Sequence, residues 1–548
     1  MNSYVGDAVE AEEAVVEAVE EAKEEEDVPD LVDAAEANSD DEDDEYDDMP
    51  DLSNPDRDDD TEDDDEPPLR RSRRIASGIN PPDKLTLAMK IQESSWKEEA
   101  KTKAINAEIS QLFDELKALE AVKEVPKGAE VLRSHMFVVD KFLANGDFDK
   151  TKARIVANGS TQDPAAYPNK SSPTLAVHSL FTVLAFYSAL AASYVMAKVD
   201  IKGAFVQTPT EGKPVYMRID KKVTRYIVDL YPLLAQFVQP DGCMFTLLLK
   251  AMYGCVQASS LWFKLLNAVL IGAGYVASET DPCVMRREVN GLIFCILIYV
   301  DDLLIFASRQ EVEALRKLLT DKFKTITMEV VNSVSYLGME IEWKARRFSV
   351  NIDFYVEQLV KDWGQLSIKH NPGRRDTFTL NENAVLLVES KRKAFHSMVQ
   401  RILYVAKRVR MDTLTVVSFL CTRVTKATED DQAKLEHLLG YFKNTLKKRL
   451  NIAGDLLMQV IAFIDAAFAL HFDSKSHTGV MVLIGGTVVY VSSRKQKCIA
   501  KSPTEAELVG FTDNLGLVEL FHEFVSFLLG REAPTPIVFQ DCIAVISL

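Results

Sequence analysis

Two acidic residues near the middle of the chain are enclosed by apolar segments of strand length. Asp301 and Asp302 follow the apolar run 292–298 and Tyr299-Val300, and a second apolar run, 303–307, begins directly after them. Two such segments joined by two acids predict a tight β-hairpin with both carboxylates at its tip. Like charges side by side are unfavourable unless a cation lies there, and Mg²⁺ takes one or two carboxylates together with substrate phosphates. The alternative is that both acids are only the polar turn of the hairpin, where Asp is common.

A second acid, Asp200, follows another strand-like segment, residues 194–199, and precedes Gly203-Ala204-Phe205. The boxes DIKGAF (200–205), YGCVQA (253–258) and YVDD (299–302) resemble, in order and spacing, those of the reverse transcriptase of copia-type long-terminal-repeat retrotransposons. Each box alone is a weak signal, whereas three boxes in order are specific. The resemblance covers roughly residues 67–548. It implies an α/β (α+β) protein, a right-hand polymerase of fingers, palm and thumb followed by a partial ribonuclease H-like domain.

The resemblance implies that Asp200, Asp301 and Asp302 form the catalytic metal site of the palm. Transfer of a nucleotide to a primer 3′-hydroxyl uses one ion to activate the hydroxyl and a second to stabilise the departing pyrophosphate. Mg²⁺ is the expected ion, with Mn²⁺ as a substitute. We expect Asp200 and Asp301 to be the bridging ligands, because adjacent strand side chains point to opposite faces and Asp302 then has the weaker claim.

Four further residues are implied to bind the incoming deoxynucleoside triphosphate. Residues 136–141 and 152–157 predict a hairpin, and its second strand resembles the fingers motif, in which Lys152 and Arg154 face the triphosphate. The alternative is that both are ordinary cations of a strand surface. Phe205 resembles an aromatic gate that collides with a ribose 2′-hydroxyl, with core packing as the alternative. Gln257 resembles a glutamine that contacts the nucleotide.

The sequence departs from the family pattern after Phe205, where it reads VQTP, and after Ala258, where it reads SSLW. Neither departure removes a metal ligand. They concern the contacts with nucleotide and primer.

The charge is divided along the chain. Residues 1–66 contain 32 acidic and two basic residues, which leaves 51 acidic and 61 basic residues in the remainder. The acidic segment is poor in aromatic residues and is expected to be disordered. The basic remainder of the chain, residues 67–548, suits a polyanionic partner. The alternative is that its excess of basic residues only covers the surface. We expect an RNA template, a DNA primer and the RNA–DNA hybrid as partners, with the hybrid's phosphates held by a cationic cluster of Lys443, Lys447, Lys448 and Arg449.

The last segment resembles the ribonuclease H domain of the same elements, through the box TEAE (504–507) and the run KSHTG (475–479). Asp465, Glu507 and Asp541 match its metal ligands, and the spacing leaves Glu505 as a competitor of Glu507. Because the family's domain continues beyond the position of Leu548 and supplies one more acidic ligand there, we expect this domain to be incomplete and its activity doubtful.

Helical periodicity predicts an amphipathic helix over 94–119 and helices over 356–363 and 394–450. The uncharged stretch 180–197 is interpreted as buried rather than as a membrane span, because small and hydroxyl-bearing residues interrupt it. Seven cysteines without a CxxC pair are typical of core thiols in a reducing compartment. We expect the protein in the cytoplasm, in virus-like particles, or in the nucleus.

These observations divide the chain into an acidic tail (1–66), a basic, proline-containing linker (67–93), fingers and palm (94–345), thumb and connection (346–456) and a ribonuclease H-like domain (457–548). The predicted activity is RNA-directed and DNA-directed DNA polymerisation. The alternative is a catalytically silent relic or fragment of a retrotransposon polyprotein that at most binds nucleic acid.

Overall fold

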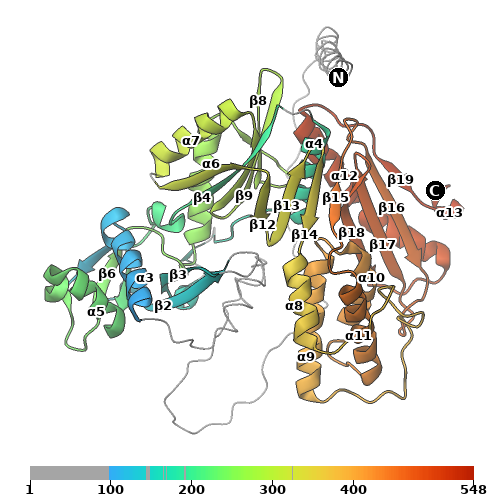
Figure 1. Ribbon diagram of the computed structural model, residues 1–548, viewed down its shortest axis with the longest axis horizontal. Helices are drawn as coiled ribbons and strands as arrows, with labels where there is room; N and C mark the ends of the chain where they lie inside the picture. The colour runs from blue at the N-terminus through green and yellow to red at the C-terminus, as the bar shows by residue number, and fades with distance from the viewer. Residues whose placement is uncertain are drawn as a thin grey trace. The chain divides into compact units, whose positions relative to one another are not determined.

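The computed structural model describes residues 98–142, 148–163, 166–167, 170–190, 193–323 and 325–547 (Figure 1). The acidic tail, which we predicted to be disordered, and the basic, proline-containing linker both lie outside these ranges. The described residues form an α+β protein, the fold class expected from the sequence, and their strands form four β-sheets. None of the helices in this part of the chain is long and apolar enough to span a bilayer.

The first sheet, with the helices beside it, is called the fingers here. Its five strands lie in the order β1-β6-β5-β2-β3, and β2 and β3 form the predicted antiparallel hairpin. Helix α3 (Glu98–Ser110) packs against β3 and contributes Ile105 and Ile109 to the fingers core. The strands are β1 (Leu119–Val122), β2 (Glu130–Phe142), β3 (Phe148–Ala157), β5 (Val215–Ile219) and β6 (Met244–Leu248). A second helix of this region is α5 (Lys221–Leu230).

The predicted extension of the first helix to Leu119 is wrong. The α-helix continues as one π-helical segment, Gln111–Glu115, and Lys117 then adopts a left-handed conformation with φ 47°. A left-handed residue cannot continue a right-handed helix. Leu119 instead opens β1, where it is buried and pairs with Leu248.

The second sheet, called the palm here, has six strands in the order β11-β4-β10-β9-β8-β7. Its strands are β4 (Val195–Ile201), β7 (Val276–Ala277), β8 (Val284–Val289), β9 (Leu292–Tyr299), β10 (Asp302–Ala307) and β11 (Ile326–Val331). The stretch 180–197 divides into the buried helix α4 (Val177–Ala189) and the start of β4. Two more helices, α6 (Ala258–Gly272) and α7 (Arg309–Phe323), pack against palm strands.

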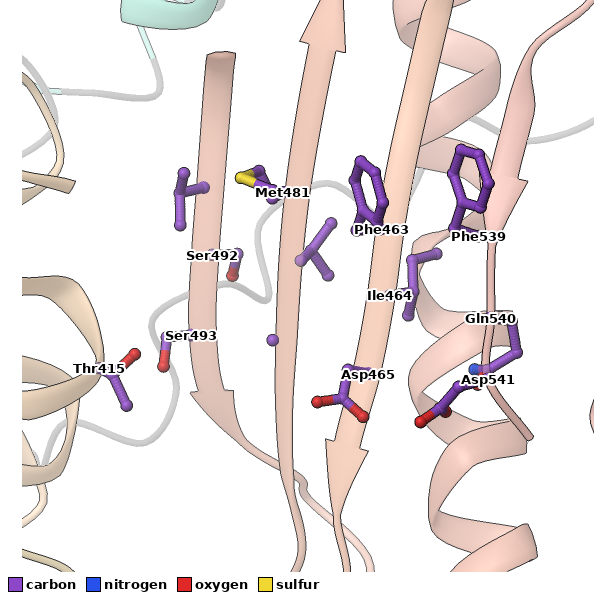
Figure 2. Close-up of a pocket in the computed structure, with 13 residues that line it drawn as sticks. Thr415, Phe463, Ile464, Asp465, Met481, Ser492, Ser493, Phe539, Gln540 and Asp541 are labelled. Carbon is purple, nitrogen blue, oxygen red and sulfur yellow. The ribbon is translucent and has the colours of Figure 1, made fainter. Parts of the chain in front are cut away.

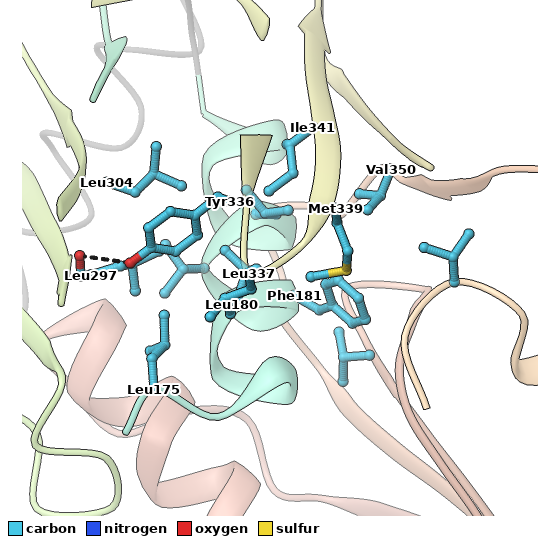
Figure 3. Close-up of a cluster of buried hydrophobic side chains, with 14 of the residues drawn as sticks. Leu175, Leu180, Phe181, Leu297, Leu304, Tyr336, Leu337, Met339, Ile341 and Val350 are labelled. Carbon is cyan, nitrogen blue, oxygen red and sulfur yellow. Dashed lines mark hydrogen bonds between the residues drawn. The ribbon is translucent and has the colours of Figure 1, made fainter. Parts of the chain in front are cut away.

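A third sheet joins the palm to the helices that follow it. Its strands lie in the order β12-β13-β14-β15: β12 (Ser333–Tyr336), β13 (Met339–Lys344), β14 (Arg347–Asn351) and β15 (Leu450–Ile452). Figure 3 shows Tyr336 and Met339 packed in the shared core, where the Tyr336 hydroxyl donates to the Leu297 carbonyl at 3.0 Å. The predicted helical region forms α8 (Asp353–Trp363), α9 (Glu389–Ala406), α10 (Leu414–Cys421) and α11 (Glu429–Asn444), but Leu450 belongs to β15.

The fourth sheet, called the nuclease-like sheet here, has the order β18-β17-β16-β19, and only the β16–β19 pair is parallel. Its strands are β16 (Val460–Ala467), β17 (His477–Ile484), β18 (Thr487–Lys495) and β19 (Ile537–Phe539). The long helix α12 (Pro503–Leu529) packs on β16 and β17. Ser502 begins it as N-cap and Gly530 ends it in a left-handed conformation with φ 71°, which glycine adopts without strain.

Candidate active site

The predicted hairpin forms, and its turn is strained. Strands β9 and β10 are antiparallel, Tyr299 pairs with Asp302, and only Val300 and Asp301 lie between them. Val300 has φ 58°, which is rare and costly for a β-branched residue. The buried indole of Trp262 on α6 donates from Nε1 to the Val300 carbonyl at 2.6 Å, and this contact helps to hold the turn.

The end of β4 brings Asp200 beside this turn. Asp200 and Asp302 are directly paired across β4 and β10, and the Ile201 amide donates to the Asp301 carbonyl at 3.2 Å. Directly opposed residues of an antiparallel pair have Cα atoms about 4.5–5.5 Å apart. The three acids, predicted from two separate boxes, are therefore neighbours in the structure.

The surroundings of the three acids differ. Burial and the nearby Arg154 lower the pKa of Lys152 in the fingers, and the charges of Glu108, Asp301 and Asp200 oppose this lowering. Asp302 instead lies beside Lys198, with Nζ 3.8 Å from Oδ1. The direct pairing of Asp200 with Asp302 places their side chains on the same face of the palm sheet, so the register does not separate Asp302 from Asp200. The bridging role of Asp200 and Asp301 stays a prediction.

The nucleotide-binding candidates also lie close to one another. The Arg154 guanidinium stands over the Tyr253 ring, 4.9 Å from its centroid, and the Phe205 ring meets the same tyrosine edge-on at 5.4 Å. Burial raises the pKa of Tyr253 to about 12, and Arg154 opposes this rise while Asp301 and Asp200 add to it. Tyr253, to which the sequence analysis assigned no role of its own, thus links Arg154 of the fingers with Phe205.

A close backbone contact joins β3 to the box that contains Gln257. The Ala157 amide donates to the Tyr253 carbonyl at 2.8 Å, and a Cβ atom at Gly254 would lie 2.1 Å from the Ala157 carbonyl oxygen. Gly254 also has φ 88°, so both the space and the conformation require glycine. Gln257 follows at the start of α6, where its Nε2 donates to the Glu211 carbonyl at 3.3 Å.

Gln162 supports the same box and was missed in the sequence. It is buried, and its Oε1 accepts from the Val256 amide at 2.8 Å. Its Nε2 donates to the hydroxyl of Tyr167 at 3.1 Å, and that hydroxyl donates to Glu130 at 2.6 Å. A single polar residue after a strand has no pattern that would reveal such a role.

The three acids of the nuclease-like sheet converge more tightly. Asp465 on β16, Glu507 on α12 and Asp541 after β19 each place a carboxylate oxygen within 4.8 Å of the others. Figure 2 shows two of them, Asp465 and Asp541. Throughout the residues that the structure describes, this is the one group of three or more metal-ligating side chains that meets this distance. Asp465 and Asp541 line one end of a cavity of about 510 Å³, which Phe463 and Phe539 also line.

Glu507 is held in place by two neutral donors. Its Oε1 accepts from the Ala466 amide and its Oε2 accepts from Gln540 Nε2, both at 3.2 Å. Burial raises its pKa, the two hydrogen bonds oppose this, and Asp465 and Asp541 raise it further. Gln540 was not singled out from the sequence.

Glu505, the competitor of Glu507 left open by the spacing, makes different contacts. Its amide donates to the Ser502 hydroxyl at 3.2 Å, and its Oε2 accepts from the Lys501 amide at 2.7 Å. These reciprocal bonds close the N-terminus of α12. Glu505 is therefore a capping residue, and Glu507 is the acid of the cluster.

The cationic cluster, which begins with Lys443 in the last turn of α11, has partners within the chain. Lys447 pairs with Glu357 at 2.7 Å and Lys448 with Asp412 at 3.0 Å. Lys443 Nζ donates to the Leu366 carbonyl at 2.9 Å, and Arg449 pairs with Asp353 at 3.5 Å. Contact with the phosphates of a hybrid would compete with these partners.

Comparison with known proteins identifies the central part of the chain. Residues 121–371 match the family model described as "Reverse transcriptase (RNA-dependent DNA polymerase)".

Over 81% of its length the chain is 25% identical to the Retrovirus-related Pol polyprotein from transposon TNT 1-94 of Nicotiana tabacum. It is 24% identical over 83% of its length to that from transposon RE2 of Arabidopsis thaliana. It covers 34% and 30% of these relatives, so it spans about a third of their length.

A solved structure of the foamy viral protease-reverse transcriptase in complex with double-stranded DNA is similar over 81% of the chain and 64% of that protein, with 13% identity and a TM-score of 0.43. From the family match and the relatives we conclude that the chain contains a reverse transcriptase domain at residues 121–371, within a sequence related to the copia-type Pol polyproteins of retrotransposons.

Proposed function

We propose that this chain is an RNA-directed and DNA-directed DNA polymerase that adds deoxynucleotides to a primer 3′-hydroxyl. One observation carries the proposal: Asp200, Asp301 and Asp302, which a shared metal site would require, are neighbours at the ends of two palm strands. A polymerase of this kind needs carboxylates on one side of the reacting phosphate and cations on the other.

The donor set fits Mg²⁺. Asp200 is exposed and Asp301 half-buried, and neither has an ion-pair partner within 4.0 Å among the described residues, so their oxygens are available to a hard cation. Mg²⁺ or Mn²⁺ held there would activate the primer hydroxyl and stabilise the leaving pyrophosphate.

The chain's own residues would position the substrate. Lys152 and Arg154 would bind the triphosphate, with Arg154 kept over the Tyr253 ring. Phe205 beside the same ring would exclude a ribose 2′-hydroxyl. Trp262 would hold the Val300-Asp301 turn through the Val300 carbonyl, and this would fix the position of the Asp301 carboxylate.

Primer extension tests the proposal. The full chain, supplied with dTTP, Mg²⁺ and oligo(dT) annealed to poly(rA) or poly(dA), should extend the primer on both templates. Chelation of the metal with EDTA should stop the reaction, and added Mg²⁺ should restore it. A folded chain that extends neither template would reject the proposal and favour the silent relic.

Ribonuclease H activity is a second candidate, favoured by the convergence of Asp465, Glu507 and Asp541 within 4.8 Å. Two-metal hydrolysis of a phosphodiester uses such a carboxylate set. The full chain with Mn²⁺ should cut the RNA strand of a hybrid, and Asp465→Asn should stop the cutting. Cutting that persists in this variant would reject the assignment.

A further inference from the structure

We infer that Glu108 is a positioning residue that holds the nucleotide-binding strand β3 in place beneath its cations. The inference rests on the proposed function and deepens it, because it concerns Lys152 and Arg154 of the same site. Glu108 lies on α3, outside the boxes that the sequence singled out.

The backbone of β3 requires a partner on one side. β3 is the outermost strand of the fingers sheet, with β2 as its single neighbour in the strand order. An outer strand presents backbone groups that no neighbouring strand can satisfy. Glu108 supplies one acceptor: its Oε1 accepts from the Ile155 amide at 3.1 Å, and both residues are buried.

The contact point is adjacent to the proposed triphosphate cations. Ala153, Ile155 and Ala157 are buried in the fingers core, whereas Lys152 and Arg154 alternate with them and are half-buried. Side chains of one strand alternate between its faces. Fixing the Ile155 backbone from α3 therefore sets the position of Arg154 directly and of Lys152 two residues further along.

The Glu108 carboxylate is buried in an apolar environment, which is energetically unfavourable for a charged group. Glu108 is 7% exposed and lies among Ile105, Ile109 and Leu112, which belong to the apolar core of the fingers. Burial raises its pKa, and the Ile155 amide and the charges of Lys152 and Arg154 oppose that rise. Burial of a carboxylate costs free energy unless a hydrogen bond and opposite charges compensate for the lost solvation, as they do at Glu108.

Three variants of the full chain separate the hydrogen bond from simple packing. Glu108→Ala removes the acceptor and the charge, and Glu108→Gln keeps an acceptor oxygen but removes the charge. Ile109→Val, one residue away in the same core, loosens the packing and leaves the acceptor. The measurements are KM for dTTP, kcat, the melting temperature and hydrogen exchange of the Ile155 amide.

We expect Glu108→Ala to raise KM for dTTP about tenfold with little change in kcat, and to speed exchange at Ile155 by a similar factor. In Glu108→Gln, both KM for dTTP and the exchange rate of the Ile155 amide should be close to the wild-type values. Ile109→Val should lower the melting temperature without changing KM.

An unchanged KM or unchanged exchange in Glu108→Ala would overturn the inference, as would an equal rise of KM in Ile109→Val. If Glu108→Ala does not fold, Glu108→Gln with wild-type exchange at Ile155 and wild-type KM supports the inference, and faster exchange at Ile155 with an unchanged KM overturns it. A wild-type chain that extends no primer instead rejects the proposed function, which is a different result.

Discussion

The chain contains two sets of three acids, and they are built differently. In the nuclease-like sheet, Asp465, Glu507 and Asp541 converge within 4.8 Å. In the palm, Asp200, Asp301 and Asp302 are neighbours along the backbone but do not form such a group among the described residues.

The printed partners of the two sets also differ. Glu507 is oriented by two neutral donors, an amide of β16 and Gln540. In the palm, the Lys198 ammonium lies 3.8 Å from the Asp302 carboxylate. The nuclease-like set is therefore ordered by neutral hydrogen bonds, whereas one palm acid lies beside a cation of the neighbouring strand.

Substitution of a palm acid should have the largest effect. Asp200→Asn should lower nucleotide addition by roughly 10³-fold or more, because it removes a proposed bridging ligand while an exposed side chain contributes little to folding. Asp302→Asn should lower it less, since Asp302 lies beside Lys198. Single-turnover rates at saturating Mg²⁺ measure both losses. Equal losses would contradict the prediction that Asp302 contributes less than Asp200.

The gate should give the next largest effect. Phe205→Ala should raise the incorporation of ribonucleotides relative to deoxynucleotides by roughly 100-fold, because the ring beside Tyr253 no longer collides with the 2′-hydroxyl. Phe205→Tyr keeps the ring and serves as the matched control. Competition between UTP and dTTP on poly(rA) measures the ratio, and an unchanged ratio would assign Phe205 to core packing.

A smaller effect is expected at the nuclease-like acids. Gln540→Ala should weaken Mn²⁺ binding there about tenfold, because Glu507 loses one of the two donors that orient it. Titration calorimetry measures the affinity, with Asp465→Asn as the variant that removes a ligand. Primer extension should be unchanged in Gln540→Ala, and a parallel loss would show that the two sites are not separate.

The smallest effect on activity is expected at a buried histidine pair of the nuclease-like domain. His471 Nε2 lies 3.0 Å from His477 Nδ1, and His477 Nε2 lies 2.7 Å from the Ser493 hydroxyl. Burial lowers the pKa of both histidines from 6.5 to about 4. Between pH 6.5 and about pH 4 these histidines bind more protons in the unfolded chain than in the folded one. The free energy of unfolding should therefore fall as the pH falls from about 6.5 to about 4.

His471→Asn should reduce this loss of stability by roughly 1–3 kcal/mol and leave primer extension at neutral pH unchanged. Denaturant unfolding at pH 7 and pH 4.5 measures the difference. A variant with the same pH dependence as the wild type would show that the pair does not titrate as described.

The sequence predicted the elements whose patterns are local. The apolar runs around Asp301 and Asp302 and the strand before Asp200 identified the palm strands, because continuous apolar segments of this length are typical of buried strands. It misplaced the end of the first helix, because periodicity through Leu119 does not reveal the left-handed Lys117.

Residues that act through one long-range hydrogen bond were beyond sequence reasoning. Glu108, Gln162 and Gln540 bond to residues 47, 94 and 33 positions away. The choice between Glu505 and Glu507 likewise depended on which one caps α12, and spacing alone does not decide that.

One measurement tests the central claim most directly: primer extension on poly(rA) with oligo(dT), dTTP and Mg²⁺, comparing the full chain with Asp301→Asn and Asp465→Asn. We predict that Asp301→Asn abolishes extension while Asp465→Asn extends the primer as the wild type does. Extension that persists in Asp301→Asn, or that is lost equally in Asp465→Asn, would contradict the assignment of polymerisation to the palm acids.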